Sequence, residues 1–257
     1  MTMYREKRFE EIKRLLTERK ELSIEDIMQA VGVSRDTARR DVVALAASGA
    51  GRRTRGGIVS LTFGHTVPSY SERLKLFSTE KTAMAKQALS LIKPGGVYFI
   101  DDSTTLLKLS QSIDVPVTIY THSLDNAIAL AVKSDVTLRV LGGKLNHHGR
   151  FFFQPENLAQ LSRIAFDAAF IGATAMSRNG VYFPYADDAD VKATLAEAAR
   201  QVIVVSETQK FQIQAPYRGF PLAAVDVLIT ERALTKKERA WFAPTTQLMV
   251  ATPEASD

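Results

Sequence analysis

The sequence predicts a two-domain protein, in which a small, mainly helical module with a short β-hairpin precedes a larger α/β domain with a largely parallel sheet. Charge is the first observation: the 257 residues carry a net charge of +5, and residues 1–60 hold 13 Lys and Arg against 9 Asp and Glu. Apolar residues recur at helical spacing in that first quarter, whereas strand-like apolar runs alternate with helical segments further on. We therefore expect domains over 1–60 and 79–257, joined by a linker over 61–78.

Composition excludes several classes of protein. Without Cys the chain has no disulfide framework, no Cys-ligated metal and no thiol nucleophile. No apolar run approaches the roughly 18 residues that a membrane helix needs, and the first residues lack the apolar core of a secretory signal. We expect a cytoplasmic protein that makes no membrane contact.

The first 50 residues predict three helices. The first covers 5–16, where apolar side chains recur at helical spacing. Ser23 is a good N-cap for the second helix, Asp26 lies where a capping box needs it, and Gly32 follows as the C′ residue. Ser34 begins a third helix two residues later. Two short helices joined by a Gly-containing turn are typical of a helix-turn-helix.

The residue types in this module are typical of a DNA-binding domain. The second helix of such a motif inserts its N-terminal residues into the major groove, and a basic hairpin beside it would bind phosphates or enter the minor groove. A protein-interaction module with a solvated Arg-rich loop stays open as the alternative. We expect double-stranded DNA as the partner and the following contact residues: Ser34, Arg35, Thr37, Ala38, Arg39, Arg40, Arg52, Arg53 and Arg55.

The second domain begins with a helix from residue 79 or 80 to 92 and continues with alternating strands and helices. Its strands are nearly continuous apolar runs, as expected for a parallel sheet covered on both faces. The runs that predict strands are 97–100, 117–120, 136–141, 168–171, 202–205 and 225–229.

Each of these runs leads into a loop with small polar residues or glycines. The carboxyl ends of parallel strands share one edge of the sheet, so these loops would converge on one crevice. Hydroxyls and glycines there favour a phosphate or carboxylate site, although helix capping alone also explains Ser103 and Ser123. Asp188 and Lys192 are spaced as an ordinary i,i+4 ion pair. His147–His148 lacks nearby carboxylates, so we expect no metal and no cofactor.

Taken together, the motifs resemble the DeoR family of bacterial sugar-metabolism regulators over essentially the whole chain. In the first domain the resemblance rests on Val33-Ser34-Arg35-Asp36-Thr37-Ala38-Arg39-Arg40-Asp41 and Arg53-Thr54-Arg55-Gly56-Gly57, which look like that family's winged-helix signature. In the second domain it rests on the order of Arg73 and the segments 80–81, 101–105, 121–124, 141–143, 167–172, 188–192 and 210–211. The family's effector domain is similar to ribose-phosphate isomerases and CoA transferases, and its members respond to phosphorylated sugars or related intermediates.

The resemblance implies roles for individual residues. Phosphate would bind Ser103, Thr104, Thr105, Lys81 and Lys210, and the sugar would bind Asp101, Asp188 and Lys192. The strand-end loops add Thr121, Ser123, Gly142 and Gly143 to the expected effector site.

The chain also departs from the family pattern around the expected effector site. His122 lies in a loop that usually reads Thr-Asn-Ser, Glu207 stands where Asp is usual, and Asp188 stands where Glu is usual. These departures concern the identity of the sugar more than the fold.

We expect a sequence-specific repressor of a carbohydrate operon, with no enzymatic activity, acting as a homodimer or homotetramer on an inverted repeat. One alternative is a sugar-phosphate isomerase fused to a DNA-binding module, with Asp101, Asp188 and Lys192 transferring protons. The other is a DNA-binding protein whose second domain only oligomerises.

Overall fold

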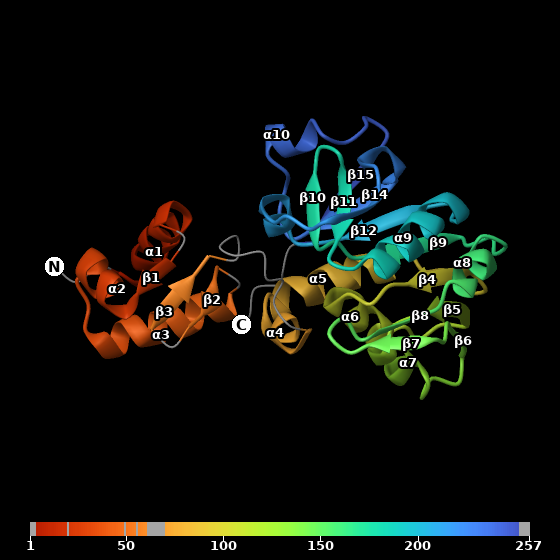
Figure 1. Ribbon diagram of the computed structural model, residues 1–257, viewed down its shortest axis with the longest axis horizontal. Helices are drawn as coiled ribbons and strands as arrows, with labels where there is room; N and C mark the ends of the chain where they lie inside the picture. Colours follow the sequence, from red (N-terminus) through yellow and green to blue (C-terminus); the bar gives the residue numbers. More distant parts are fainter. Residues whose placement is uncertain (1–3, 20, 49, 55, 61–69, 252–257) are drawn as a thin grey trace. The chain divides into compact units, whose positions relative to one another are not determined.

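The computed structural model describes residues 4–19, 21–48, 50–54, 56–60 and 70–251. The chain divides into two compact units, Met1–Phe77 and Ser78–Asp257 (Figure 1). Among the described residues, none of the helices combines the length and the apolar character needed to cross a bilayer.

The first unit combines helices with a small antiparallel sheet of strand order β1-β3-β2. The sheet pairs Glu21–Ser23 (β1) and Arg52–Arg53 (β2) with the two sides of Gly57–Val59 (β3). The expected hairpin is therefore present, and β1 is an addition that no sequence pattern indicated. The helices of this unit are α1 (Arg5–Arg19), α2 (Ile24–Val31), α3 (Arg35–Ala47) and α4 (Tyr70–Lys75).

The helix caps expected from the sequence are confirmed. Ser23 and Asp26 form a reciprocal capping box at the start of α2. Gly32 has a φ of 65°, the left-handed conformation that favours glycine after a helix. The Ser34 hydroxyl accepts from the Thr37 backbone N–H at the start of α3. These caps fix the turn between α2 and α3.

The second half of the expected linker is helical. Helix α4 lies in the range 61–78, which the sequence indicated as turn-rich, and the part of that range from 61 to 69 lies outside the described residues.

A seven-stranded sheet forms the centre of the second unit, with strand order β15-β14-β12-β9-β4-β5-β6 and parallel pairing throughout. The largely parallel sheet is confirmed. Its strands are β4 (Val97–Ile100), β5 (Val117–Thr121), β6 (Val136–Val140), β9 (Ala168–Ile171), β12 (Val202–Val205), β14 (Val227–Thr230) and β15 (Gln247–Val250).

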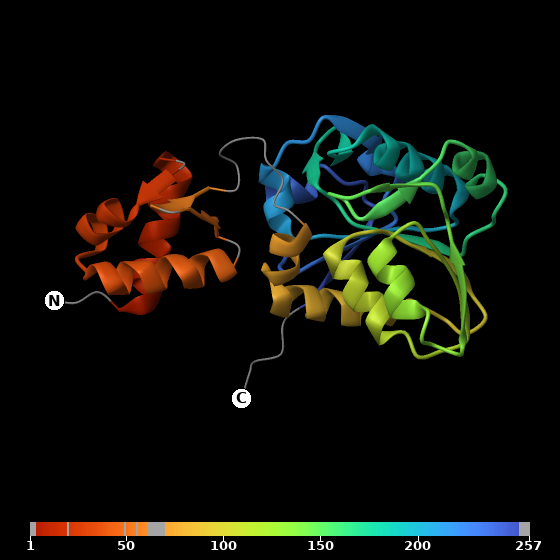
Figure 2. The same ribbon diagram turned by 60° about the horizontal axis from the view of Figure 1, so that its bottom comes forward.

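Both faces of this sheet are covered (Figures 1 and 2). Side chains alternate between the two faces along each strand, so Ile100 and Phe170 belong to one apolar core while Phe99 and Ile171 belong to the other. One face packs against α5 (Ser78–Leu89), α6 (Thr104–Ser112) and α7 (Leu124–Leu130). The other packs against α8 (Glu156–Leu161), α9 (Ala186–Ala198) and a small antiparallel sheet of β10 (Ala175–Ser177), β11 (Gly180–Phe183) and β13 (Tyr217–Phe220).

Shorter elements complete the unit. They are the hairpin β7 (Lys144–Asn146) and β8 (Phe151–Phe153), the 3-10 turns η1 (Thr208–Gln212) and η2 (Leu222–Ala224), and α10 (Lys236–Arg239).

The strand order places a switch point between β4 and β9. From β4 the chain adds β5 and β6 on one side, and from β9 it adds β12, β14 and β15 on the other. At such a point the loops leaving two neighbouring strands turn toward opposite faces and leave a crevice at the carboxyl edge, where ligands of open α/β sheets bind. The fold therefore predicts a ligand site beside the loops that follow β4 and β9.

Candidate DNA-binding surface and effector site

The expected DNA-contacting side chains lie mostly on the exposed side of α3. Ser34, Arg35, Arg39 and Arg40 are exposed, and Thr37 is partly exposed. Arg35 forms an ion pair with the exposed Glu25 of α2.

Ala38 is a correction to the expected contact set. Its side chain is 0% exposed, in the same core as Val42 and Leu45. Positions 38, 42 and 45 form the inward stripe of a helix with 3.6 residues per turn, so Ala38 packs the module together and cannot contact a base edge.

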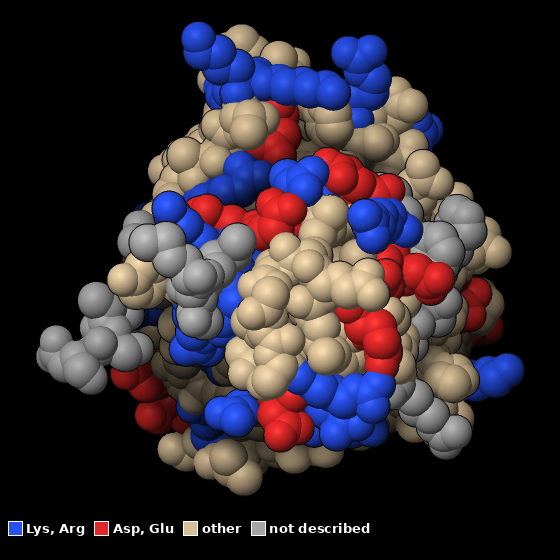
Figure 3. Space-filling model, turned by 90° about the vertical axis from the view of Figure 1, so that its left-hand side faces the viewer, with Lys and Arg blue, Asp and Glu red and all other residues tan. Residues whose placement is uncertain are grey.

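The wing is only partly described. Arg53 is exposed at the end of β2, the backbone of Arg52 belongs to the same strand, and Arg55 lies outside the described residues. In Figure 3, Lys and Arg side chains of the described residues are interleaved with Asp and Glu side chains. The contacts expected from α3 and the wing with DNA therefore remain predictions.

A partly buried ion pair joins α3 to α1. Arg8 donates to both carboxylate oxygens of Asp41, at 2.8 and 3.0 Å, and the side chains are 11% and 5% exposed. This bidentate pair holds the helix that carries the expected contact residues.

In the second unit, charged side chains gather at the switch point. Asp101 and Asp102 follow β4, His122 follows β5, and Asp188 and Lys192 project from α9. All five side chains are buried. We call these five residues the carboxylate cluster.

Lys192 is the cation at the centre of the cluster. Its ammonium lies 2.7 Å from Asp101 Oδ1 and 2.9 Å from Asp102 Oδ1, and it also contacts Asp188. The Phe183 ring lies 4.9 Å from the same ammonium. The ion pair that spacing indicated between Asp188 and Lys192 is confirmed, and the fold adds two more carboxylates to it.

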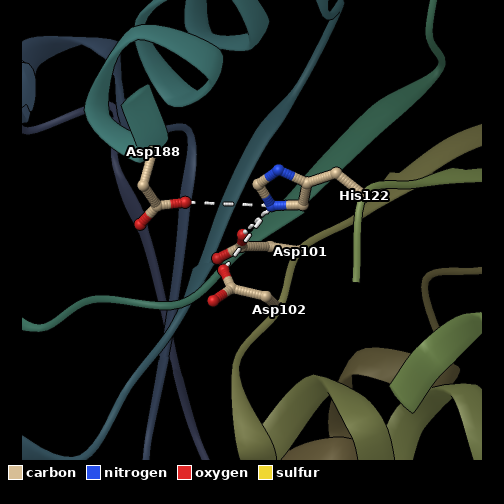
Figure 4. A group of neighbouring side chains, drawn as sticks. All are labelled: Asp101, Asp102, His122 and Asp188. Atoms are coloured by element: carbon tan, nitrogen blue, oxygen red, sulfur yellow. Dashed lines mark hydrogen bonds and ion pairs between the residues drawn. The ribbon is translucent and has the colours of Figure 1, made fainter. Parts of the chain in front are cut away.

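His122 contacts the same three carboxylates. Its Nε2 lies 3.2 Å from Asp101, 3.6 Å from Asp102 and 3.8 Å from Asp188 (Figure 4). Burial alone would lower the pKa of His122, but the hydrogen bonds to Asp101 and Asp102 outweigh it and raise that pKa to about 9.

The carboxylates of the cluster respond differently to burial. Burial would raise the pKa of Asp102, but Lys192 and the hydrogen bond from His122 hold it well below the usual range. Burial and the nearby Asp102 charge raise the pKa of Asp188 to about 7, against the opposing effect of Lys192. Burial opposes the charge of Lys192, yet the three carboxylates raise its pKa overall.

The donor set of the cluster could suggest a metal site. One atom from each of Asp101, Asp102, His122 and Asp188 lies within 4.8 Å of the others. The Lys192 ammonium, however, already contacts all three carboxylates and would repel a divalent cation. These residues therefore fit an internally compensated cluster better than a metal centre.

The loop after β4 is held tightly against the loop after β9. The Gly172 backbone N–H donates to Asp101 Oδ2 at 2.9 Å. A Cβ at Gly172 would lie 2.3 Å from the Ser103 Cβ, so only glycine allows this approach. The Ser103 hydroxyl caps α6 by accepting from the Leu106 N–H, and the side chains of Thr104 and Thr105 are buried in the first turn.

Other expected effector residues have structural partners. The Thr121 hydroxyl donates to the Ile100 carbonyl at 2.6 Å, and Ser123 caps α7. Gly142 is exposed, and the Gly142 carbonyl accepts from Asn157. Gly143 has a φ of 124°, and a Cβ there would collide with the Phe153 carbonyl. Capping and turn geometry explain these residues, and their ligand contacts remain predictions.

A second group of charges lies along the same edge, after β12. Lys81 of α5 lies 3.5 Å from Glu207 Oε1, and Lys210 follows in η1. All three side chains are buried. Burial would raise the pKa of Glu207, but Lys210 and Lys81 lower it. Two ammonium groups and one carboxylate give these three residues a net charge of +1.

The sequence analysis did not assign ligand roles to Asp102, His122 or Glu207. Asp102 lies within the segment 101–105 of the family resemblance, and His122 and Glu207 are departures from the family pattern. The signal that could have found His122 is its place after β5, the strand next to β4 in the sheet.

Comparison with known proteins supports the same division of the chain. Residues 8–63 match the DeoR-like helix-turn-helix domain, and residues 77–232 match the DeoR C terminal sensor domain. The chain is 35% identical over 231 residues to the HTH-type transcriptional repressor GlcR of Bacillus subtilis, which covers 90% of each chain. It is 28% identical over 256 residues to the lactose phosphotransferase system repressor of Lactococcus lactis, covering 97% of this chain and 100% of that protein.

Solved structures show weaker similarity. Ribose 5-phosphate isomerase A from Methanocaldococcus jannaschii aligns over 52% of this chain and 54% of that chain, with 17% identity and a TM-score of 0.37. Similarity at this level carries no argument about function. The two family matches and the identity to GlcR confirm the resemblance that the sequence motifs indicated. The chain therefore belongs to the DeoR family of transcriptional regulators, with its DNA-binding domain followed by its sensor domain.

Proposed function

We propose that this regulator represses a carbohydrate operon in the cytoplasm and that a phosphorylated sugar, bound at the carboxyl edge of the parallel sheet, changes its affinity for the operator. The observation that carries the proposal is the pair of charge groups along that edge. The carboxylate cluster suits the hydroxyls of a sugar, and Lys81 with Lys210 suits a phosphate.

The energy required for such regulation is modest. A 10- to 100-fold change in operator affinity needs only about 1.4–2.8 kcal/mol of coupling between the two sites. The ligand must bind one arrangement of the protein better than another, because equal binding to both would shift nothing.

A ligand screen tests the effector site. A sugar phosphate present at 100 times its dissociation constant should stabilise the full-length protein by about 2.7 kcal/mol, which a thermal-shift assay detects. Lys81→Met and Lys210→Met should abolish the shift, whereas Lys86→Met, an exposed change on the same helix as Lys81, should preserve it. If no phosphorylated sugar in a broad panel stabilises the protein, the domain that only oligomerises becomes the better account.

A mobility-shift assay tests the regulation itself. The DNA upstream of the protein's own gene is the first operator to try, with and without each ligand that stabilises the protein. A repressor released by its effector should lose affinity at least tenfold, and an unchanged affinity with every stabilising ligand would contradict the proposal.

The enzyme alternative has one observation in its favour. His122 lies within 3.8 Å of three carboxylates, and burial raises the pKa of Asp188 to about 7, so acid and base groups stand together. Against catalysis, Lys192 pairs with all three carboxylates. Turnover assays on aldose and ketose phosphates separate the two functions, and a rate abolished by Asp101→Asn would favour the enzyme.

We also propose a homodimer or homotetramer. One module with few phosphate contacts binds DNA weakly, and two modules related by a two-fold axis match an inverted repeat. Light scattering coupled to size exclusion measures the mass, and a monomer that binds its operator at full affinity would contradict this assignment.

A further inference from the structure

His122 lies inside the carboxylate cluster and cannot turn away from it. Its side chain is fully buried. The imidazole contacts the rings of Phe99 and Phe151, with centroids 5.6 and 5.2 Å away. Its Nε2 faces Asp101, Asp102 and Asp188 (Figure 4). Packing therefore holds the imidazole in contact with the carboxylates.

The charges of the cluster nearly cancel when His122 is protonated. The ionisable groups that the structure places around the imidazole are Asp101 and Asp102 from the loop after β4, and Asp188 and Lys192 from α9. The raised pKa of His122, about 9, keeps the imidazole charged at neutral pH, and the pKa of Asp188, about 7, leaves that carboxyl partly neutral. The positive charges of Lys192 and His122 are then opposed by the carboxylates of Asp101 and Asp102 and by the partly ionised carboxyl of Asp188.

A cluster of this composition suits a hydroxyl group better than an amine. A sugar hydroxyl donates to a carboxylate and accepts from an ammonium or imidazolium N–H. A ligand ammonium only donates, so it could pair with the carboxylates but not with the Lys192 ammonium or the His122 imidazolium, which would repel it.

The second ring nitrogen of His122, Nδ1, is a further observation in favour of a ligand oxygen. Nδ1 lies on the other side of the ring from the carboxylates (Figure 4), is buried, and has no hydrogen-bond partner among the described residues. A buried polar atom without a partner is uncommon and calls for a group to pair with. In the imidazolium this atom is a donor, so an acceptor oxygen on that side of the ring, from another group of the ligand or from water, would satisfy it.

We propose that His122 sets the charge class of the effector: its imidazolium admits a sugar phosphate with an uncharged hydroxyl at the cluster and excludes the amino-sugar phosphate of the same shape. This inference rests on the proposed effector site and adds a specificity residue to it.

Matched ligands test the inference on the full-length protein. Calorimetry would compare glucose 6-phosphate with glucosamine 6-phosphate, and galactose 6-phosphate with galactosamine 6-phosphate. The wild type should bind the hydroxyl member of a pair at least tenfold more tightly. His122→Gln removes the positive charge. It should lower the ratio of the two affinities at least tenfold relative to wild type, which leaves no preference or a preference for the amino sugar. His147→Gln, at an exposed histidine of the β7–β8 turn, should behave as wild type.

The outcomes separate this inference from the proposed function. If no sugar phosphate binds the wild type, both the proposed effector site and the inference about His122 are wrong. Binding in which the wild type accepts the amino sugar equally well, or in which His122→Gln keeps the wild-type preference, overturns the inference alone.

A ligand-free measurement covers the case in which His122→Gln does not fold. NMR of the ¹⁵N-labelled wild type should show one of the four histidine side chains still as an imidazolium at pH 7.5. His147→Gln identifies one of the other three signals. If all four side chains are neutral at that pH, the inference is wrong.

Discussion

The ammonium of Lys192 donates to the carboxylate of Asp102 at 2.9 Å, across 90 positions of the chain. This contact joins α9 to the loop after β4, and the same ammonium reaches Asp101. The geometry of the carboxylate cluster therefore depends on a contact between α9 and the loop after β4, which makes Lys192 the first residue to test.

Lys192→Met should destabilise the second unit by about 3–5 kcal/mol, because it leaves buried carboxylates without their ammonium. Trp241 is the single tryptophan of the chain and packs in one core of that unit, so its fluorescence during urea unfolding reports on this domain. Lys237→Met, an exposed change on α10, should shift the free energy of unfolding by less than about 0.5 kcal/mol. Adding Asp102→Asn to Lys192→Met should recover part of the loss, and equal stabilities for the two Lys variants would contradict this role.

The stability of the second unit should fall as the pH rises. The folded-state pKa is raised from 6.5 to about 9 for His122 and from 3.8 to about 7 for Asp188. A raised folded-state pKa means that the folded form binds the proton more tightly, so the stabilisation is full below the ordinary pKa and is lost as the pH passes the raised one. The window is therefore pH 6.5 to 9 for His122 and about pH 4 to 7 for Asp188.

Comparison with His122→Gln isolates the histidine. The difference between the unfolding free energies of wild type and variant should shrink by up to about 3 kcal/mol between pH 6 and 9, at about 1.4 kcal/mol per pKa unit. Urea titrations of Trp241 fluorescence at pH 6, 7.5 and 9 measure it. A difference that stays constant across this range would show that His122 does not titrate there.

Asp41→Ala should loosen the DNA-binding unit. The change removes the two hydrogen bonds that the partly buried Arg8 donates to Asp41, at a cost of about 1–3 kcal/mol. Hydrogen exchange of the full-length protein should rise in peptides from α1 and α3 and stay unchanged in the seven-stranded sheet. Asp36→Ala, exposed in the first turn of α3, is the matched control. Unchanged exchange in α1 would contradict the role assigned to the ion pair.

The sheet was largely predictable because its strands are short apolar runs between polar loops. The bounds of β4, β9 and β12 agree with the sequence prediction, since side chains on both faces are buried and every position must be apolar. Strand β1 was not predictable, because three residues carry no periodicity and pair with β3 more than thirty positions later.

The sequence predicted where the effector site lies in the fold, but not which side chains contact one another there. Parallel strands bring their carboxyl ends to one edge, so the loop from Asp101 to Thr105 could be located from its position after a strand. The contact of His122 with Asp188 depends on the packing of α9 over the sheet, which spacing does not reveal. The expectation that Ala38 contacts DNA was wrong, because Ala38 belongs to the inward stripe of α3 although its neighbour Arg39 is exposed.

Arg39→Ala should separate base recognition from phosphate binding. Arg39 is exposed on α3, and a guanidinium there can reach a guanine through two hydrogen bonds. Operator affinity should then fall by about 1–3 kcal/mol, while affinity for random DNA changes little. Mobility shifts at fixed salt on the upstream DNA and on a scrambled duplex measure both. Arg178→Ala, an exposed arginine of the second unit, should leave both affinities unchanged. An equal loss on the two duplexes would assign Arg39 to the phosphate backbone, because phosphates carry no sequence information.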